Sequence, residues 1–172
     1  NTSTSNETVP REFPNSITGW MDGSMVYGSS LKDSNWLRTF SRGQLKVTET
    51  EQGEFLPLAG DDDDDAPAVS FVGFSASERY VAGDPRANEH AGLIAMHVIF
   101  VREHNRLAEL IITQNDSLND EQIYQLARKI NNAQMQRITY SEYLPSLGIE
   151  LADYEGFDET IDPRISNEFA TL

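Results

Sequence analysis

Residues 83–106 read GDPRANEHAGLIAMHVIFVREHNR, and this stretch predicts the first of two long helices. Asp84 is a favourable N-cap residue, and Pro85 would follow at the first helical position, where its missing N–H does no harm. Apolar residues then recur at helical spacing, namely Leu93, Met96, Phe100, Val101, Leu107 and Leu110. We therefore expect a helix from about residue 85 to residue 113.

A second long helix is predicted after a short polar turn. Asn119 and Gln122 have the spacing of a capping box, in which each side chain accepts a backbone N–H of the other residue. The stretch that follows, EQIYQLARKINNAQMQRITYSEY, places apolar residues at buried helical positions, among them Ile123, Ala127, Ile130 and Ile138. Pro145 should stop this helix soon after its last turn.

The rest of the chain predicts loops and short elements. Residues 1–14 read as a polar N-terminal arm, and residues 15–30 as a loop with short extended pieces. Residues 33–40 can form a short helix with Trp36, Leu37 and Phe40 inward, and residues 43–58 alternate as in a hairpin. Five consecutive aspartates make residues 60–67 a solvated loop, and the acidic tail is irregular, with a helical turn near 166–172.

Composition limits the class of protein. The chain has 172 residues, 38% of them hydrophobic, which suits residues 15–172 forming one domain, or a large piece of one, after the arm. The net charge of −15 disfavours nucleic acid and anionic membranes as partners, and no apolar run is long enough for a membrane span. Without cysteine the chain has neither disulfides nor thiolate metal sites. Asn-x-Ser/Thr sequons at Asn1, Asn6 and Asn115 favour a secreted protein.

Three charged or polar residues cluster at the predicted start of the first helix. Arg86, Glu89 and His90 are spaced i, i+3 and i+4, so within a helix they would share one face with Cβ atoms about 5–6 Å apart. Free N–H groups of a first turn favour negative charge, and Arg86 adds a planar fork of donors, so an anionic ligand could dock there. The alternative is a simple salt bridge between Arg86 and Glu89.

All three histidines lie on this helix at intervals of seven residues, at His90, His97 and His104. Residues seven apart in a helix are separated by about 10 Å along its axis. Because a metal holds its nitrogen ligands at about 2 Å, no two of these side chains can share one ion. We therefore expect His97 and His104 to be packing or hydrogen-bonding residues.

The stretch TGWMDGS, residues 18–24, gathers oxygen-bearing groups at alternate positions. Thr18, Asp22 and Ser24 carry side-chain oxygens, and Trp20 can offer its backbone carbonyl. In an extended loop alternate residues face the same way, and a set of hard oxygens suits calcium rather than zinc. An ordinary turn is the alternative.

Six blocks of the sequence, in this order, resemble the animal-type heme peroxidase superfamily of myeloperoxidase, lactoperoxidase and peroxidasin. They are DGSMVYGSS, LR…F..G.L, AGDPRANE, REHNRLA, ARKI…Q.ITYSEYLP.LG and ISNEFATL. The likeness covers about residues 15–172. Because the chain lacks the cysteines of the disulfide-bearing vertebrate members, we expect a bacterial-type member. The resemblance implies a mainly α fold, with helices around the heme, long loops and little β structure.

The resemblance also implies an activity and a set of site residues. The whole enzyme would reduce hydrogen peroxide and oxidise a halide, pseudohalide or small organic donor, with heme and calcium as cofactors. Arg86 falls on the distal arginine, and Glu89 on the glutamate that forms an ester to heme in members with covalent heme. His90 takes the place of a methionine in myeloperoxidase. The calcium loop of the family falls on Thr18, the Trp20 carbonyl, Asp22 and Ser24.

The histidines that the family uses on the two sides of the heme do not match any histidine of this chain. The resemblance places the distal one before the chain and the proximal one just after it, so we expect an internal segment whose partners are the remaining segments of the same peroxidase. Two alternatives stay open. One is a catalytically silent adhesion or matrix domain, against which the intact Arg86 and Glu89 argue. The other is a fatty-acid oxygenase of the same superfamily with a radical-bearing tyrosine, for which Tyr140 and Tyr143 lie in a suitable region.

Overall fold

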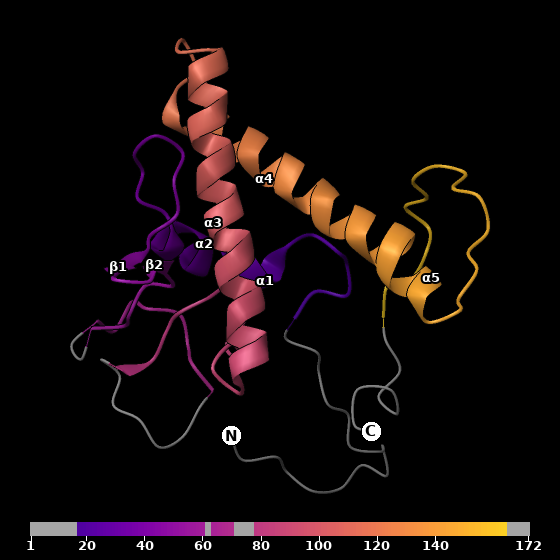
Figure 1. Ribbon diagram of the computed structural model, residues 1–172, viewed down its shortest axis with the longest axis horizontal. Helices are drawn as coiled ribbons and strands as arrows, with labels where there is room; N and C mark the ends of the chain where they lie inside the picture. The colour runs from indigo at the N-terminus through magenta and orange to yellow at the C-terminus, as the bar shows by residue number, and fades with distance from the viewer. Residues whose placement is uncertain (1–16, 61–62, 71–77, 165–172) are drawn as a thin grey trace, which may run out of the picture.

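The computed structural model describes residues 17–60, 63–70 and 78–164, and its described part is mainly helical (Figure 1). The elements are α1 (Ser24–Tyr27), α2 (Leu31–Leu37), β1 (Thr48–Thr50), β2 (Gly53–Phe55), α3 (Ala91–Gln114), α4 (Asp120–Ile138), the π-helical turn η2 (Thr139–Tyr143) and α5 (Leu144–Ser146). This confirms the predicted mainly α fold class with long loops and little β structure. The predicted arm at residues 1–14 and the helical turn near 166–172 lie outside the described residues.

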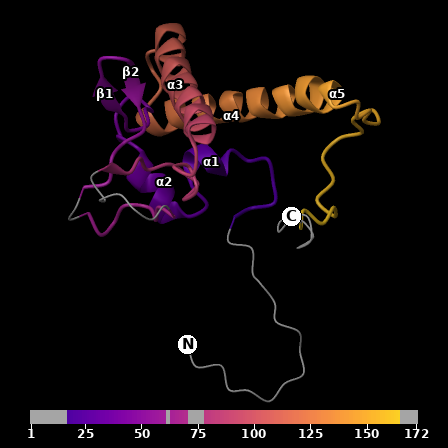
Figure 2. The ribbon, with the colours of Figure 1, turned by 60° about the horizontal axis from the view of Figure 1, so that its bottom comes forward.

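The two long helices form the frame of the fold. They follow one another through a short turn, pack together beside it and then diverge, as Figures 1 and 2 show from two directions. The predicted capping box begins α4, because Asn119 Oδ1 accepts the Gln122 N–H at 2.9 Å and Gln122 Oε1 accepts the Asn119 N–H at 3.0 Å. Beyond Ile138 the chain continues through η2 into α5, which ends at Ser146. The run of helix therefore stops one residue after Pro145, as predicted, although its last turns are π-helical and a short α5 rather than α4.

The first long helix begins at Ala91, so the prediction of a start at residue 85 was wrong. Its N-cap is His90, whose Nδ1 accepts the Leu93 N–H at 3.1 Å. An earlier start would need the Pro85 carbonyl to accept a helical N–H, but that carbonyl already accepts the Ser70 N–H at 2.8 Å. The bond from Ser70 therefore helps to hold residues 84–90 in turns rather than in a helix. The local sequence does not encode this contact, because Ser70 belongs to a separate loop.

Asn88 fixes the segment before α3 to the loop that contains Tyr80. Its amide makes two hydrogen bonds to the backbone of Tyr80, accepting from N–H at 3.1 Å and donating to the carbonyl at 2.6 Å. Tyr80 in turn pairs with Leu58 in an isolated bridge. These bonds hold residues 84–90 against the body of the protein and give the site below its backbone.

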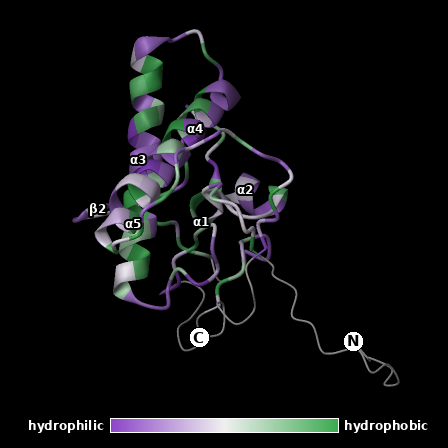
Figure 3. Cartoon of the chain, turned by 90° about the vertical axis from the view of Figure 1, so that its right-hand side faces the viewer, coloured by the Kyte–Doolittle hydropathy of each residue, from purple (hydrophilic) through white to green (hydrophobic). Residues whose placement is uncertain are grey.

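The core lies where α3 meets α1, α4 and the loops around the hairpin. Its largest fully buried side chains are Tyr27, Tyr124, Leu56, His97, His104, Val26, Val81 and Asn131. Hydrophobic and hydrophilic residues alternate around α3 and α4 in Figure 3, as expected of helices with one buried side. Four residues expected in the core are instead exposed: Phe40 (59%), Met96, Leu110 and Ile138 (41%). Phe40 has a positive φ of 55°, and its exposed ring lies beside the Arg38 guanidinium.

A buried polar network ties α1, α3 and α4 together around His104. Its Nε2 lies 2.8 Å from the Gly43 carbonyl, which can only accept, so Nε2 carries the proton. Nδ1 then accepts the Tyr27 hydroxyl at 2.9 Å. Asn131 donates from Nδ2 to the same hydroxyl and to the Phe100 carbonyl, each at 2.9 Å. The prediction that His97 and His104 are packing or hydrogen-bonding residues is confirmed by their burial.

Burial also sets the charge state of this network. It lowers the pKa of His104 to about 4, and the positive charges of Arg38 and Arg128 act in the same direction. Burial raises the pKa of Tyr27. The network is therefore neutral near pH 7, as an enclosed polar cluster requires.

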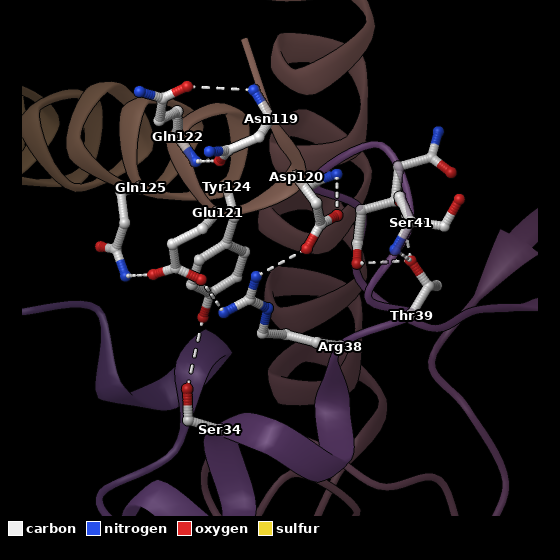
Figure 4. A network of polar contacts seen from close by, with 12 residues as sticks. Ser34, Arg38, Thr39, Ser41, Asn119, Asp120, Glu121, Gln122, Tyr124 and Gln125 are labelled. Atoms are coloured by element: carbon white, nitrogen blue, oxygen red, sulfur yellow. Dashed lines mark hydrogen bonds and ion pairs between the residues drawn. The ribbon is translucent and has the colours of Figure 1, made fainter.

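Arg38 joins the segment after α2 to the start of α4 (Figure 4). Its Nη2 donates to Asp120 Oδ2 at 2.9 Å and its Nη1 to Glu121 Oε2 at 2.5 Å, while the guanidinium stacks over the Tyr124 ring at 3.9 Å. Asp120 Oδ1 also accepts the Gly43 N–H at 2.6 Å. Because Arg38 is buried, this clamp fixes the entry of α4 against the N-terminal loops.

The predicted hairpin is confirmed as an antiparallel pair, with Thr48 opposite Phe55 and Thr50 opposite Gly53. Arg102 of α3 donates from Nε to the Glu54 carbonyl at 2.5 Å and so attaches β2 to the helix. In the aspartate run, the described residues 63–65 are exposed, as expected of a solvated loop. No helix in the described part of the chain combines the length and hydrophobicity that a membrane crossing needs.

Candidate functional site

Arg86 lies in the turns before α3, where its side chain is held by Asp84. The guanidinium donates from Nε to Asp84 Oδ1 at 3.0 Å and from Nη2 to Oδ2 at 2.8 Å, and the Arg86 backbone N–H adds a bond to Oδ1 at 2.9 Å. The Asp84 side chain is only 13% exposed, whereas that of Arg86 is 55% exposed. Hydrogen bonding to Arg86 lowers the pKa of the Asp84 carboxyl, so the anchor is charged and the arginine is fixed at an open surface.

Glu89 and His90 complete this segment, and both are exposed. The three predicted residues do not share a helical face, because α3 begins after them. The alternative of an Arg86–Glu89 salt bridge is also wrong, since the ion pair of Arg86 is with Asp84. The Glu89 carboxylate makes no hydrogen bond or ion pair with the residues that the structure describes, so it remains open to a ligand.

The three histidines differ in what their nitrogens can still bind. His104 uses both nitrogens within the core network. His97 donates from Nδ1 to the Leu93 carbonyl at 2.8 Å, and its Nε2 is enclosed without a hydrogen-bond partner, so an ion could reach it only if the core opened. His90 uses Nδ1 as the cap of α3, which leaves Nε2 open at the surface. No pair of them converges, as the spacing predicted.

The loop with the predicted cation ligands lies before α1. Thr18 Oγ1 accepts the Trp20 N–H at 3.1 Å, and Asp22 Oδ1 accepts the Ser24 N–H at 3.0 Å, so both side chains curl back on their own loop. Ser24 is the first residue of α1, and its N-cap Gly23 has a φ of 71°. The loop is therefore a pair of side-chain turns ending in a helix, not the extended loop that alternate spacing suggested.

The oxygen set of this loop suits a hard cation but is incomplete. Within the described ranges, no three His, Asp or Glu side chains converge as they would on a metal ion. Asp22 is the one carboxylate among the four predicted ligands, and the others offer hydroxyl or carbonyl oxygens. Calcium takes six to eight oxygens, so the loop fits part of a calcium site and no more.

The two predicted sites are adjacent in space, which the sequence did not reveal. Gly83 is buried against α1, and a Cβ at this position would lie 2.1 Å from the Ser24 carbonyl oxygen and 2.4 Å from the Gly28 nitrogen. A side chain there would force the two backbones apart. The segment that carries Arg86 therefore packs directly on the helix that follows the cation loop.

Three contacts of functional interest were missed by the sequence reasoning. Asp84 was read as a helix cap but anchors Arg86, and the signal for this was an acidic residue two positions before an arginine. Asn132 and Gln136 of α4 bind the cation loop from more than 100 residues away, and no local pattern marks them.

Comparison with known proteins assigns this arrangement to a family. The chain matches the Animal haem peroxidase family over residues 1–172, and it belongs to that family. Peroxidase mlt-7 of Caenorhabditis elegans is 40% identical over 167 residues, which make up 94% of this chain and 22% of that protein. Lactoperoxidase of Mesocricetus auratus is 39% identical over 171 residues, or 95% of this chain and 24% of that protein. The chain thus spans about a quarter of the length of these relatives.

Solved structures agree with this assignment. Peroxidase A from Dictyostelium discoideum superposes with a TM-score of 0.79 and 34% identity, covering 91% of this chain and 30% of that one. A fatty acid alpha-dioxygenase of Arabidopsis thaliana superposes less completely, with a TM-score of 0.53 and 30% identity over 70% of this chain and 16% of that one.

Proposed function

We propose that this chain is part of a calcium-containing heme peroxidase that reduces hydrogen peroxide and oxidises a halide, pseudohalide or small organic donor. The observation that carries the proposal is Arg86, a permanently charged donor anchored by Asp84 and exposed beside a free carboxylate. Such an arrangement is suited to an oxygen atom on which charge develops.

The described residues fit one wall of a heme site. Arg86 binds Asp84 through Nε and Nη2, which leaves Nη1 to donate to a peroxide oxygen. When bound, heme supplies the redox chemistry, and the protein supplies orientation and electrostatics. The role of Arg86 is to hold peroxide and to stabilise the negative charge on its departing oxygen, while Asp84 prevents the guanidinium from swinging away.

Glu89 and His90 would face the heme from the same segment. The Glu89 carboxylate has no hydrogen bond or ion pair with described residues, so it is free to bind the heme edge or to form an ester with it. His90 is fixed by its capping bond, which uses Nδ1 and leaves Nε2 open. The nitrogens of His97 and His104 are enclosed or already hydrogen-bonded, so neither histidine can ligate the heme iron. The iron ligand would be another residue of the peroxidase.

The calcium part of the proposal rests on Thr18, the Trp20 carbonyl, Asp22 and Ser24. Their loop lies against the segment of Arg86 through Gly83, so a bound cation would stiffen the backbone that positions the arginine. The remaining ligands would come from other parts of the peroxidase. We also propose that the protein is secreted.

A peroxidase is favoured over the two alternatives. The chain superposes more completely on Peroxidase A than on the fatty acid dioxygenase. A silent adhesion domain would need neither the Asp84–Arg86 clamp nor an unengaged Glu89.

The proposal is tested on the full-length protein that contains this chain. We expect a heme absorption band after purification, and oxidation of a small donor such as guaiacol that depends on hydrogen peroxide. Arg106→Lys serves as a control, because among the described residues this exposed arginine pairs with Glu103 on its own helix, and the change should leave turnover intact. A protein without a heme band, or one that holds heme but turns over no donor, would contradict the proposal.

A further inference from the structure

We infer that Asn132 and Gln136 of α4 are positioning residues that shape the loop of residues 18–24 for cation binding. The inference rests on the proposed calcium site and extends it to two side chains that contact no cation themselves. They lie one helical turn apart on α4, on the side that faces the loop.

The hydrogen bonds divide the loop carbonyls into two kinds. Asn132 donates from Nδ2 to the Asp22 carbonyl at 2.8 Å, and Gln136 donates from Nε2 to the Met21 carbonyl at 2.9 Å. The Trp20 carbonyl, by contrast, has no hydrogen bond to described residues. Two carbonyls are thus held toward α4, and the one assigned to the cation is left free to bind it.

Close packing at Gly23 shows how tightly the loop is seated on α4. A Cβ on Gly23 would lie 2.1 Å from Asn132 Oδ1 and 3.0 Å from Met135 Cε, and the φ of +71° already favours glycine. A larger residue would strain this backbone and displace the end of the Asn132 side chain. The two carbonyls that α4 holds belong to Met21 and Asp22, the residues directly before this glycine.

The orientation of the Asn132 amide follows from its partners. If the amide were reversed, its oxygen would face the Asp22 carbonyl oxygen, and two acceptors would repel each other. Nδ2 is therefore the group that holds the loop, and Oδ1 is left buried beside Gly23 without a hydrogen bond. An isosteric apolar side chain would fill the same space and lose only the donor.

Positioning of this kind has a measurable consequence for affinity. Residues that orient the ligands of a metal typically change its affinity by about 10- to 100-fold when they are removed. We expect a loss in this range for Asn132→Leu. We expect a smaller loss for Gln136→Leu, because Gln136 is exposed and water can replace its bond.

The experiment measures the binding of terbium(III) to the full-length protein. Terbium replaces calcium at oxygen sites, and it luminesces when a nearby tryptophan is excited. Trp20 lies in the loop, so the emission that disappears in a Trp20→Phe variant reports an ion bound there. Titration with terbium, and with calcium as competitor, gives the affinity of each variant. Gln125→Ala is the matched control, because this amide lies on the same helix but bonds to Glu121 and not to the loop.

We expect Asn132→Leu to weaken the Trp20-sensitised binding by about 10- to 100-fold, with Gln125→Ala unchanged. Thermal unfolding in the presence of a chelator shows whether each variant folds, and Gln136→Leu decides the question if Asn132→Leu does not. Wild-type affinity in both variants, while Asp22→Ala loses binding, would overturn the inference and leave the calcium site standing. If Asp22→Ala binds terbium as tightly as the wild type, the loop is not the site, and both proposals fall.

Discussion

The buried imidazole of His104 predicts a specific loss of stability in mild acid. Its pKa is lowered from the ordinary value of 6.5 to about 4 by burial, with Arg38 and Arg128 adding to the effect. As the pH falls below 6.5, the unfolded chain therefore takes up a proton at this side chain before the folded chain does. Stability contributed by the neutral imidazole is complete above pH 6.5 and is lost progressively down to about pH 4.

The size of the loss follows from the shift. Each pKa unit corresponds to about 1.4 kcal/mol, so the whole shift of about 2.5 units corresponds to about 3 kcal/mol. Between pH 7.5 and pH 5 the two-state expression gives about 2 kcal/mol of this, before most carboxylates begin to titrate. The slope should approach one proton, or about 1.4 kcal/mol per pH unit, in the lower part of this window.

The assay is urea unfolding at pH values from 7.5 to 5, followed by circular dichroism. His104→Gln removes the titrating group, so its free energy of unfolding should change by about 2 kcal/mol less than that of the wild type over this range. His90→Asn is the control, because it removes an exposed imidazole outside the core network and keeps a side-chain acceptor for the cap of α3. A His104→Gln variant with the same pH dependence as the wild type would refute the reasoning and show that His104 is protonated without penalty.

Three further predictions concern single side chains. Glu89→Gln should lower the fraction of heme that remains on the protein after acid-acetone extraction, and complete extraction from the wild type would remove the proposed ester. Arg38→Met should lower the unfolding free energy by about 2–3 kcal/mol, somewhat below the usual loss for a fully buried ion pair, because its carboxylate partners are partly exposed. The same change at the exposed Arg42 should cost clearly less, because water screens its pair with Glu109, and equal losses would contradict the clamp. Asn119→Ala removes half of the α4 capping box and should cost about 1 kcal/mol in the same measurement.

Elements whose signals are local could be predicted from the sequence. The capping box of Asn119 and Gln122 defined the start of α4 because both partners lie within one turn. The hairpin followed from alternation over residues 43–58, and the packing role of His104 from the spacing of the three histidines, which ruled out a shared ion. Each of these depends on neighbours within a few residues.

The start of α3 could not be predicted because a distant group decides it. Asp84 and Pro85 form a sound local start signal, yet the Pro85 carbonyl is bound by Ser70, and the helix begins only at Ala91. The exposure of Met96 and Ile138 has a related cause, since helical spacing predicts which residues share a face but not which faces find partners.

The candidate site was predicted in its residues but not in its geometry. Residue type pointed to Arg86 as a charged donor and to Asp22 as a hard ligand. The anchoring of Arg86 by Asp84, and the contact of Asn132 with the cation loop, depend on how separate segments pack. Neither could be derived from spacing along the chain.

The central claim is that Arg86 acts on peroxide as an anchored, planar donor. Its most direct test is the second-order rate at which hydrogen peroxide changes the heme absorption of the full-length protein, measured by stopped flow for the wild type, Arg86→Lys and the control Arg106→Lys. Lysine keeps the positive charge but lacks the planar guanidinium, which can bind Asp84 and peroxide at the same time. The account therefore predicts that Arg86→Lys reacts at least about tenfold more slowly than the wild type, while the control reacts at the wild-type rate. An Arg86→Lys protein that holds heme and reacts with peroxide at the wild-type rate would contradict the account.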